Sequence, residues 1–557
     1  MDENKIKSPW RNFSSDILQN YIGVKTLEQL AYYLPLLRSK EFNELEIYKK
    51  NNLAKIFNSF SGADYLEKKE FRKDFFSSLS DELLKNIFTL FFSEDIKFER
   101  TKVIDKCSNI KWEKSPETES LCKILNIDET LLPDKKESLP YVVSNFDAVY
   151  PFKSLKEYQS SVSYKAIEEL KNSAARFVIQ MPTGSGKTRV AMEVISQFIN
   201  DNEADIKILW LAHQKELCSQ AFQCFVEVWS HLRAKSLNLY RMWDEGDKTV
   251  LPVNLNGNSM IIGNFQKFYS ELTNSPSKYS SIAKHLDLII IDEAHKAIAP
   301  TYKKVIDDLA NIKTRVVGLT ATPGRSISNE ESNKSLSDFF HNKIISIPEK
   351  QEGIISYLRN IKVLSRAIYD PIHTEEKISL SKKQLDYMEQ FLELPPQLIK
   401  QLSNDKVRNF ELLKKIDLQI KNNPNAKILF FGLSIEHSKF ICAILNTLGI
   451  KASHVDGKTS LNRRSSILGK FKEGELNVLC NERLMSTGFD APKTDTIVIA
   501  RPTFSIVLYS QIIGRGLRGP AIGGTEKCTI IDVKDNIQGF SDHDFVYEYF
   551  EEYFENI

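Results

Sequence analysis

The sequence predicts an α/β protein in which two doubly wound parallel sheets follow one another and a mostly helical domain precedes them. From about residue 149 onward, short apolar runs alternate with helical stretches, which is the pattern of parallel sheets covered by helices on both faces. The runs fall into two sets, separated by a long polar stretch. Each set predicts one sheet, so we expect two α/β domains in the 557-residue chain.

Residues 1–148 have a different pattern from the rest of the chain. Lys, Glu, Phe and Leu recur there at spacings that fit amphipathic helices, as at 80–88. No phosphate loop, metal-ligand cluster or nuclease-like group of acids occurs in this part of the sequence. We therefore expect a helical accessory domain of unassigned role, with a polar junction at 135–138.

The apolar runs set the expected domain boundaries. The first domain is predicted at 149–335, with strands at 177–179, 206–212, 261–263, 286–291 and 316–319. The second is predicted at 336–540, with strands at 428–431, 478–480, 496–500 and 528–531. Because residues 378–421 are polar and helix-like, we expect a helical insertion near the start of the second domain. Residues 541–557 would form a C-terminal tail.

A glycine-rich loop at 181–188, Met-Pro-Thr-Gly-Ser-Gly-Lys-Thr, stands between a predicted strand and a helix-like segment. This order of elements holds a nucleoside triphosphate. Gly184 and Gly186 allow the tight turn, while Lys187 would reach the β- and γ-phosphates and Thr188 would ligate Mg²⁺. Methionine replaces the first glycine of the general motif, and a loop of this kind standing alone is also compatible with a tight turn that carries a solvated lysine.

The apolar run at 286–291 ends in the tetrapeptide Asp-Glu-Ala-His. A continuous apolar run is typical of a strand buried on both faces, as parallel sheets require. At its end, Asp292 would hold Mg²⁺, directly or through water, and Glu293 would polarise the attacking water. The alternative is a helix N-cap followed by an acid in the first turn. A phosphate loop in the same domain favours the metal site.

The second predicted domain contains Gln-Ile-Ile-Gly-Arg-Gly-Leu-Arg at 511–518. On a helix, positions 511, 515 and 518 lie on one face, so both arginines can address one ligand. Arginine keeps its charge and offers a fork of donors, which suits the γ-phosphate of a transition state. The alternative is an exposed basic face that pairs with acids. Upstream, Gly-Phe-Asp-Ala-Pro at 488–492 follows a predicted strand, where open α/β sheets bind ligands.

Composition limits the partners. The net charge is only +2, so any nucleic-acid-binding track must be local. Seven cysteines are scattered without C-x-x-C pairs, which argues against a disulfide framework or zinc site and for a reducing, cytoplasmic location. The first residues carry no apolar signal segment, and no run approaches the roughly 20 apolar residues that cross a bilayer. We therefore expect no membrane partner.

Together, these motifs resemble superfamily 2 of the helicases and nucleic-acid translocases. The phosphate loop without its first glycine is this superfamily's form, Asp-Glu-Ala-His at 292–295 is its motif II, and 511–518 resembles its motif VI. Other similar segments follow in the superfamily's order at 155–159, 211–217, 263–266, 319–323 and 481–492. The resemblance covers about 152 to 520 and is best to the branch with type I and type III restriction motors, DNA-repair helicases and phage helicases.

In that branch, a stretch similar to 352–358 and 363–364 opens the second domain. The resemblance implies two RecA-like domains, ATP and Mg²⁺ as cofactors, and nucleic acid as the partner, with DNA favoured over RNA. It implies that the chain is an ATP-dependent helicase or translocase in which ATP bridges the two domains and hydrolysis reopens the cleft.

Site roles carried over from the resemblance are as follows. Catalysis is expected from Lys187, Glu293, Gln511, Arg515 and Arg518. Nucleotide binding is expected from Phe152, Gln159, Thr183, Gly184, Ser185, Gly186, Lys187, Thr188, Gly488 and Asp490, and metal binding from Thr188 and Asp292. Coupling of hydrolysis to movement is expected from His295, Thr320 and Thr322. Nucleic-acid contacts are expected from His213, Gln266, Ser434, Gly457 and Thr487.

Two alternatives remain open on the sequence. One is a duplex DNA translocase that does not separate strands and serves as the motor of a restriction or anti-phage defence complex. In that case a nuclease or another defence or repair subunit would bind through residues 1–148. The other is an ATP-gated RNA or DNA sensor, in which the helical domain binds a partner and hydrolysis acts as a timer.

Overall fold

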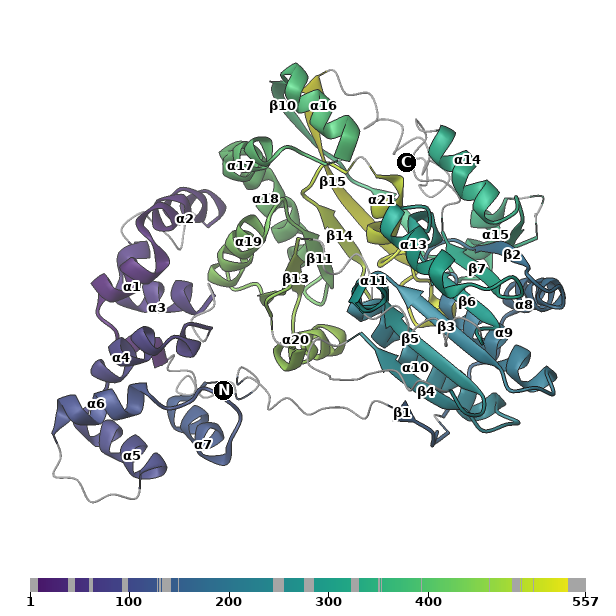
Figure 1. Cartoon of the computed structure of the whole chain (residues 1–557). Helices are drawn as coiled ribbons and strands as arrows, with labels where there is room; N and C mark the ends of the chain where they lie inside the picture. The colour runs from purple at the N-terminus through teal and green to yellow at the C-terminus, as the bar shows by residue number, and fades with distance from the viewer. Residues whose placement is uncertain are drawn as a thin grey trace.

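The computed structural model describes residues 9–38, 46–59, 64–92, 99–127, 129, 132, 142–148, 150–243, 255–274, 285–321, 330–348, 351, 353–391, 393–459, 461–482, 491, 493–503 and 505–538. They form an N-terminal helical part and two α/β parts, each built on one largely parallel sheet (Figure 1). The predicted fold class is confirmed.

The N-terminal part is helical, as its amphipathic pattern predicts. Its helices are α1 (Ser15–Ile22), α2 (Val24–Leu37), α3 (Lys50–Ser59), α4 (Lys69–Ser77), α5 (Asp81–Phe91), α6 (Arg100–Ser108) and α7 (Pro116–Leu125). Serine starts three of them, because the side chains of Ser14, Ser80 and Ser115 accept a backbone N–H of the first turn. Its centre is aromatic, with Trp10 and Phe13 packed on rings of α3 and α4.

The first α/β domain has the strand order β1-β4-β5-β3-β6-β7-β2-β8, all parallel except for β1 against β4. Its strands are β1 (Val142–Val143), β2 (Arg176–Gln180), β3 (Lys207–Ala212), β4 (Asn238–Met242), β5 (Ser259–Asn264), β6 (Leu288–Asp292), β7 (Arg315–Thr320) and β8 (Ile344–Ser346). Its helices are α8 (Glu157–Leu170), α9 (Lys187–Asp201), α10 (Lys215–Leu232), α11 (Phe265–Asn274), α13 (Pro300–Leu309), α14 (Glu330–Phe339) and α15 (Ile354–Asn360). Every residue of β3, β5 and β6 is buried, as expected of strands covered on both faces.

The second α/β domain has the parallel order β10-β15-β14-β11-β13-β12, with β9 also paired to β15. Its strands are β9 (Arg366–Tyr369), β10 (Ile372–Ser379), β11 (Ile428–Phe431), β12 (Ala452–His454), β13 (Val478–Asn481), β14 (Thr496–Ile499) and β15 (Lys527–Gln538). Its helices are α16 (Lys382–Phe391), α17 (Pro396–Asn404), α18 (Lys406–Asn422), α19 (Ile435–Thr447), α20 (Leu461–Glu473) and α21 (Ile506–Ile513). The stretch expected to be a helical insertion thus contains α16, α17 and most of α18.

The expected boundaries of the first domain need correction at both ends. β1 pairs with β4, so the first sheet begins before residue 149. β8 pairs with β2, and α15 buries Ile355 and Leu358 in the first domain's core, so this domain continues well past residue 335. The stretch expected to open the second domain therefore completes the first. β1 and β8 are too short to show the alternation of apolar and polar residues that would predict a strand from the sequence.

The helical part is built onto the second domain, on the side away from the first (Figure 1). Buried side chains of α1 to α7 form one continuous apolar cluster with Leu412 and Ile416 of α18 and with Phe440 and Ile444 of α19. The ring of Tyr33 lies 5.9 Å from that of Phe440. Because burial of such a cluster is the main favourable term in folding, the two parts behave as one body.

Polar contacts reinforce this junction. Arg38 at the end of α2 donates to both carboxylate oxygens of Asp417 on α18, at 2.9 and 2.5 Å. The Lys406 ammonium lies 4.6 Å from the centre of the Tyr32 ring. A planar guanidinium matches a carboxylate in this paired geometry, so the contact fixes the orientation of α2 on α18.

None of the helices in the described segments combines the length and apolar character that a bilayer-spanning helix needs. All seven cysteines carry free thiols, six of them buried.

A buried ion pair ties α18 to the second sheet. Arg408 donates from Nε and Nη2 to the two oxygens of Asp535 on β15, at 2.7 and 2.9 Å, and both side chains are almost fully buried. Nη2 also donates to the carbonyl of Ala500, which follows β14. The pair therefore holds the insertion helix to the ends of two strands.

Replacing Arg408 by methionine should destabilise the second domain by about 3–5 kcal/mol, because Asp535 would remain buried without its partner. Urea unfolding followed by far-ultraviolet circular dichroism measures the change. Lys414→Met is the control on the same helix, since the Lys414–Glu411 pair is exposed and should change stability by no more than about 0.5 kcal/mol. Equal stability of the two variants would contradict the role of the buried pair.

Candidate functional site

The glycine-rich loop lies between the end of β2 and the start of α9. Gly184 and Gly186 have φ angles of +85° and +93°, a region that L side chains rarely adopt. The Ser185 hydroxyl donates to the Pro182 carbonyl at 2.7 Å, and Lys187 Nζ donates to the Met181 carbonyl at 3.2 Å. The loop is therefore preformed, with its lysine folded back over the turn.

Gln159 braces this loop from outside. Its Oε1 accepts the backbone N–H of Lys156 at 2.9 Å, and its Nε2 donates to the Ser185 carbonyl at 2.9 Å. The Tyr158 hydroxyl donates to the same carbonyl at 2.8 Å. A Cβ on Gly186 would lie 2.4 Å from Gln159 Nε2, so any larger residue here would displace the Gln159 amide from the loop. The residue expected to read adenine thus contacts the phosphate loop directly.

Phe152, the expected stacking residue, lies beside the start of α9. The Arg189 guanidinium sits 5.2 Å from the centre of its ring, and the His231 ring lies 4.9 Å away. The side chain remains 37% exposed.

Asp292 and Glu293 lie at the carboxyl end of β6. Glu293 adopts a left-handed conformation with φ of 55°, and its backbone N–H donates to Asp292 Oδ1 at 3.0 Å. Burial and the neighbouring Glu293 carboxylate raise the pKa of Asp292, while Lys187 and Arg515 oppose this rise. His295 Nδ1 lies 3.4 Å from Glu293 Oε2. The phosphate-loop lysine and the acidic pair are therefore close enough to interact electrostatically.

His213 also lies in this acidic neighbourhood. Burial lowers its pKa to about 3; nearby Lys296 and His295 act in the same direction, and Glu293 opposes them. The sequence predicts a nucleic-acid contact for His213, and the structure places this residue within electrostatic range of the acidic strand end. Its place at the end of β3, next to β6 in the sheet, explains this position.

Arginines of the second domain complete the same site. Desolvation lowers the pKa of Arg515 to about 10, and the Glu293 and Asp292 carboxylates counter that effect across the domain boundary. Arg515 in turn acts on Lys187, whose pKa burial lowers. Desolvation likewise lowers the pKa of Arg518 to about 10. The expected catalytic groups of the two domains are thus brought together.

Contact between the two loops is direct. A Cβ on Gly514 would lie 2.1 Å from Thr183 Cγ2, and one on Gly184 would lie 3.8 Å from Arg518 Cγ. Thr183 Oγ1 is buried and forms no hydrogen bond within the described part of the chain. Gly514 of the arginine segment (residues 511–518) therefore packs directly on Thr183 of the phosphate loop, and the contact has no room for a further methyl group.

The segment that connects the two domains, which includes Val363 and Ser365, also contacts the arginine segment. No sequence motif predicted this contact. Gly519 N–H donates to the Val363 carbonyl at 2.8 Å, and Ser365 N–H donates to the Leu517 carbonyl at 3.2 Å. The Ser365 hydroxyl donates to the Arg518 carbonyl at 2.6 Å. The segment that crosses between domains thus forms a short antiparallel pair with the arginine segment.

The remaining expected residues lie in several places. Gln511 is buried on α21, and His295 and Thr320 are buried next to the site, where the Thr320 carbonyl accepts Met181 N–H at 3.1 Å. Gln266 and Gly457 are exposed, and Ser434 is half-buried. Four expected residues lie outside the described residues, namely Thr322, Thr487, Gly488 and Asp490.

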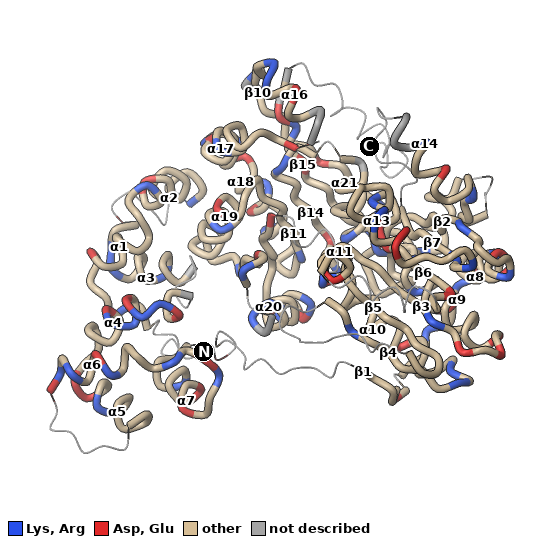
Figure 2. The backbone as a smooth tube through the Cα atoms, viewed as in Figure 1, with Lys and Arg blue, Asp and Glu red and all other residues tan. Residues whose placement is uncertain are grey.

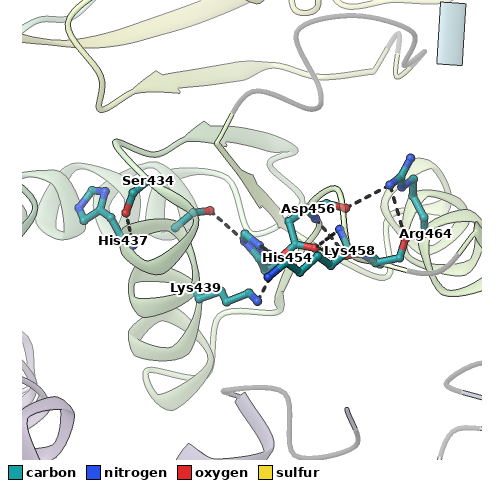
Figure 3. Close-up of polar contacts among 9 residues, drawn as sticks. Ser434, His437, Lys439, His454, Asp456, Lys458 and Arg464 are labelled. Atoms are coloured by element: carbon teal, nitrogen blue, oxygen red, sulfur yellow. Dashed lines mark hydrogen bonds and ion pairs between the residues drawn. The ribbon is translucent and has the colours of Figure 1, made fainter. Parts of the chain in front are cut away.

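On the second domain, Asp456 organises the turn that contains Gly457 (Figure 3). Its Oδ1 accepts the backbone N–H groups of Lys458 and Thr459 at 2.9 Å each, and its Oδ2 lies 3.0 Å from Lys439 Nζ. The interaction with His454, followed by those with Lys439 and Thr459, holds the pKa of Asp456 well below its usual range, while burial opposes this shift. The turn is therefore rigid while Gly457 stays exposed.

This turn is also linked to the first domain. Arg464 donates to the Asp456 carbonyl at 3.1 Å and reaches across to Glu216 of α10, with Nη1 to Oε1 at 2.5 Å. The ion pair is mostly buried. The two domains thus touch at the nucleotide site and again at this rim.

Gly514→Ala should lower ATP hydrolysis by at least about 10²-fold, because the added methyl keeps the arginine segment from closing on Thr183 and misplaces Arg515 by an ångström or more. Stability should fall as well, although Gly514 has an ordinary right-handed helical conformation, because the same Cβ would lie 2.8 Å from the Ser510 carbonyl oxygen. Steady-state phosphate release and thermal unfolding measure the two effects. Gly469→Ala on α20, where a Cβ meets nothing within 4 Å, is the matched control. Full activity in Gly514→Ala would contradict the observed contact.

Comparison with known proteins gives matches for both α/β domains. Residues 152–325 match the family described as type III restriction enzyme, res subunit, and residues 408–519 match the helicase conserved C-terminal domain. The chain is 27% identical over 388 residues to the putative ATP-dependent helicase IRC3 of Saccharomyces cerevisiae, covering 68% of this chain and 51% of that protein. It is 28% identical to a 51.5 kDa protein of a Lactococcus phage, over 61% of this chain and 62% of that protein.

The matched regions thus span only half to three-fifths of those relatives. Among solved structures, the fold is similar to that of the ATP-dependent type ISP restriction-modification enzyme LlaBIII bound to DNA. That match has a TM-score of 0.50 and 14% identity, and it covers 72% of this chain and 30% of that one. The chain belongs to superfamily 2 of the helicases and translocases, in the branch that contains the restriction-enzyme motors.

Proposed function

We propose that the protein is an ATP hydrolase that couples ATP turnover to movement along nucleic acid, as a helicase or translocase. The observation that carries this proposal is the packing of Gly514 on Thr183, which brings Arg515 within electrostatic range of the Asp292–Glu293 pair of the opposite domain. A guanidinium held there can stabilise the charge that develops on a transferred phosphoryl group. Hydrolysis in such a site depends on the spacing of the two domains.

Each nucleotide-binding group would have a distinct role. The backbone N–H groups of the glycine-rich loop would hold the phosphates, with Lys187 addressing the β- and γ-phosphates. Glu293 would orient the attacking water. His295, whose Nδ1 lies beside the Glu293 carboxylate, would couple hydrolysis to movement of the domains. Gln159 would contact the edge of the adenine ring. Because its Nε2 also donates a hydrogen bond to the Ser185 carbonyl, binding of the base would affect the position of the phosphate loop.

The residues present also fit a magnesium ion. Thr188 offers a hydroxyl and Asp292 a buried carboxylate, both hard oxygen donors. The described residues hold no group of three His, Cys, Asp or Glu side chains that would suffice without other ligands. Phosphate oxygens and water would therefore complete the shell, and the bound ion would neutralise charge on the phosphates.

Movement would follow from closure of the cleft. ATP would draw Thr183 and Gly184 of one domain toward Gly514 and Arg518 of the other, and loss of the γ-phosphate would release them. The crossing segment, hydrogen-bonded to Arg518 through Ser365, would follow the arginines. Alternate opening and closing would move the rims of the two domains relative to each other.

Nucleic acid would lie along the rim marked by Gln266 of the first domain and by Ser434 and Gly457 of the second. These positions are exposed or half-buried and would contact backbone phosphates, which carry no sequence information. Basic and acidic residues are interspersed in the helical part and in both α/β domains, as far as the structure describes them (Figure 2), which is consistent with local contacts that a motor must release repeatedly. DNA is favoured over RNA by the match to the restriction-enzyme family.

A second candidate is a duplex DNA translocase that does not separate strands and works in the cytoplasm as the motor of a restriction or anti-phage defence complex. It is favoured by the family match at 152–325 and by the fold of a DNA-bound restriction-modification enzyme. The helical part would then be the surface for a nuclease or another defence or repair subunit.

Lys187→Ala should abolish ATP hydrolysis, because the loop loses the charge that addresses the phosphates. Arg515→Ala should bind ATP nearly as well as the wild type but turn over about 10³-fold more slowly. Fluorescent-nucleotide binding and phosphate release separate the two outcomes. An unchanged turnover rate in Arg515→Ala would show that the second domain does not act on the nucleotide.

Single-stranded DNA, duplex DNA and RNA should differ in how far they stimulate hydrolysis, with DNA acting best. A tailed duplex should be unwound by a helicase, whereas a translocase should be stimulated by duplex DNA without displacing a strand. Both assays use the full chain, with Lys187→Ala as the inactive control. Stimulation by RNA alone would reject both DNA functions.

A further inference from the structure

The ring of Phe152 is paired with a guanidinium at the start of α9. Arg189, in the first turn of that helix, places its Cζ over the ring, 5.2 Å from the ring centre. A cation at this distance is attracted by the electrons of the ring face. Phe152 therefore does not act alone as a stacking surface, since part of its face is shared with Arg189.

Two further contacts hold Arg189 in this position. Its Nη2 donates to the carbonyl of Lys153, the residue that follows Phe152, at 2.6 Å. The same nitrogen lies 3.2 Å from Oε2 of Glu193, one turn further along α9, and 18% of the Arg189 side chain is exposed. The guanidinium is therefore fixed both to its own helix and to the segment that carries Phe152.

One edge of the guanidinium has donors that are not used inside the protein. Arg189 Nη1 is buried and forms no hydrogen bond with any of the residues that the structure describes. A buried donor of this kind costs free energy unless a ligand supplies an acceptor. A nucleotide has suitable acceptors in the ring nitrogens of its base and in the oxygens of its ribose.

Arg189 also lies beside the residue expected to read adenine. A Cβ placed on Gly186 would lie 2.4 Å from Gln159 Nε2 and 4.0 Å from Arg189 Cβ. The glutamine amide and the arginine thus flank the same glycine of the phosphate loop. Beyond its bonds to Lys156 and Ser185, the Gln159 amide keeps a second N–H and a second acceptor site for the edge of a base.

Helix α10 braces the Phe152 ring from another direction. The ring of His231 lies 4.9 Å from that of Phe152, at an interplanar angle of 45°. It also meets the ring of Tyr150 edge to face, at 5.1 Å and 84°. Phe152 is therefore held in place by contacts with both α9 and α10.

We propose that Arg189 is a nucleotide-binding residue and that, together with Phe152, it forms the surface on which the base of ATP stacks. The inference rests on the proposed function, in which ATP binds on the glycine-rich loop. A planar guanidinium stacks on a heterocycle as it does on a phenyl ring. Because this guanidinium is already fixed, little side-chain freedom is lost when the base binds. Gln159 reads the edge of the base, while Arg189 and Phe152 contact its face.

Arg189→Met tests the proposal in the whole chain. Methionine retains an apolar contact with Phe152 but loses the charge, the plane and the donors. The dissociation constant of ATP with Mg²⁺, measured by isothermal titration calorimetry, should rise about tenfold, which is the size of one stacking contact with a cation. The turnover rate at saturating ATP should stay unchanged, because the groups around the γ-phosphate are not altered.

Two other ligands separate contact with the base from other effects. Inorganic triphosphate has the phosphates but no base, so Arg189→Met should bind it as well as the wild type does. GTP should lose affinity by the same factor as ATP, because stacking does not depend on the edge of the base that Gln159 reads. Arg189→Lys should recover little of the lost ATP affinity, since lysine supplies the charge without the plane or the fork of donors.

Arg315→Met is the matched control in the same domain. The Arg315 guanidinium also lies 5.2 Å from the centre of a phenylalanine ring, that of Phe198, and its Nε donates to the Leu170 carbonyl at 2.5 Å. Arg315 begins β7, which runs parallel to β2, so it lies at the end of the sheet opposite to the phosphate loop. This variant should therefore bind ATP as the wild type does.

The outcomes distinguish the two proposals. If the wild type does not bind ATP, the proposed function fails and the role of Arg189 fails with it. If the wild type binds ATP and Arg189→Met binds it equally well, only the role of Arg189 is overturned. That role is also overturned if inorganic triphosphate weakens as much as ATP, if the preference for ATP over GTP changes, or if Arg189→Lys or Arg315→Met contradicts its expected result.

Discussion

The structure depends on the balance of charge at the carboxyl end of β6. Two adjacent carboxylates, Asp292 and Glu293, are partly removed from water there, which is unfavourable unless cations lie near. One cation, Lys187, comes from the same domain, and the other, Arg515, comes from the opposite one. Electrostatic attraction therefore favours the closed arrangement of the two domains. A triphosphate placed among these groups would alter that balance, since it brings more negative charge than the acids hold.

Residues around the nucleotide site determine how closure of the two domains affects the rest of the protein. Gly514 and Gly184 allow the loops to meet without side chains between them. Ser365 joins the crossing segment to the arginine segment, so the connection between domains follows the arginines. At the far rim, Arg464 and Glu216 form a second link. Since α2 and α3 share a core with α18 and α19, the helical part must travel with the second domain when the cleft changes.

Long apolar runs in the sequence predicted most of the strands, whereas the shortest strands were not predicted. The runs at 206–212 and 286–291 are apolar apart from Lys207 and Asp287, and they gave rise to β3 and β6, because buried parallel strands need apolar residues on both faces. β1 and β8 are only two and three residues long, and their pairing is set by neighbours in space. α15 was assigned to the second domain by resemblance, yet its apolar side packs in the first.

The same distinction applies to the site. Residues on contiguous motifs, such as Lys187 and Asp292, were identifiable because their spacing reflects a strand–loop–helix geometry. Ser365 and Arg464 carry no local signature, since their partners lie far away in the chain. His213 was assigned by motif order, and the adjacency of β3 and β6 in the sheet brings it within electrostatic range of Glu293 and His295.

The common core of the helical part and the second domain has a consequence for biosynthesis. The ribosome releases α2 and α3 first, then the entire first domain, and only afterwards α18 and α19, on which they pack. During that interval α2 and α3 expose an apolar surface, because the helices that bury it have not yet been translated. Such a surface is a binding site for chaperones and a source of aggregation, so slow translation should reduce the yield of this protein more than that of a chain whose domains fold in order.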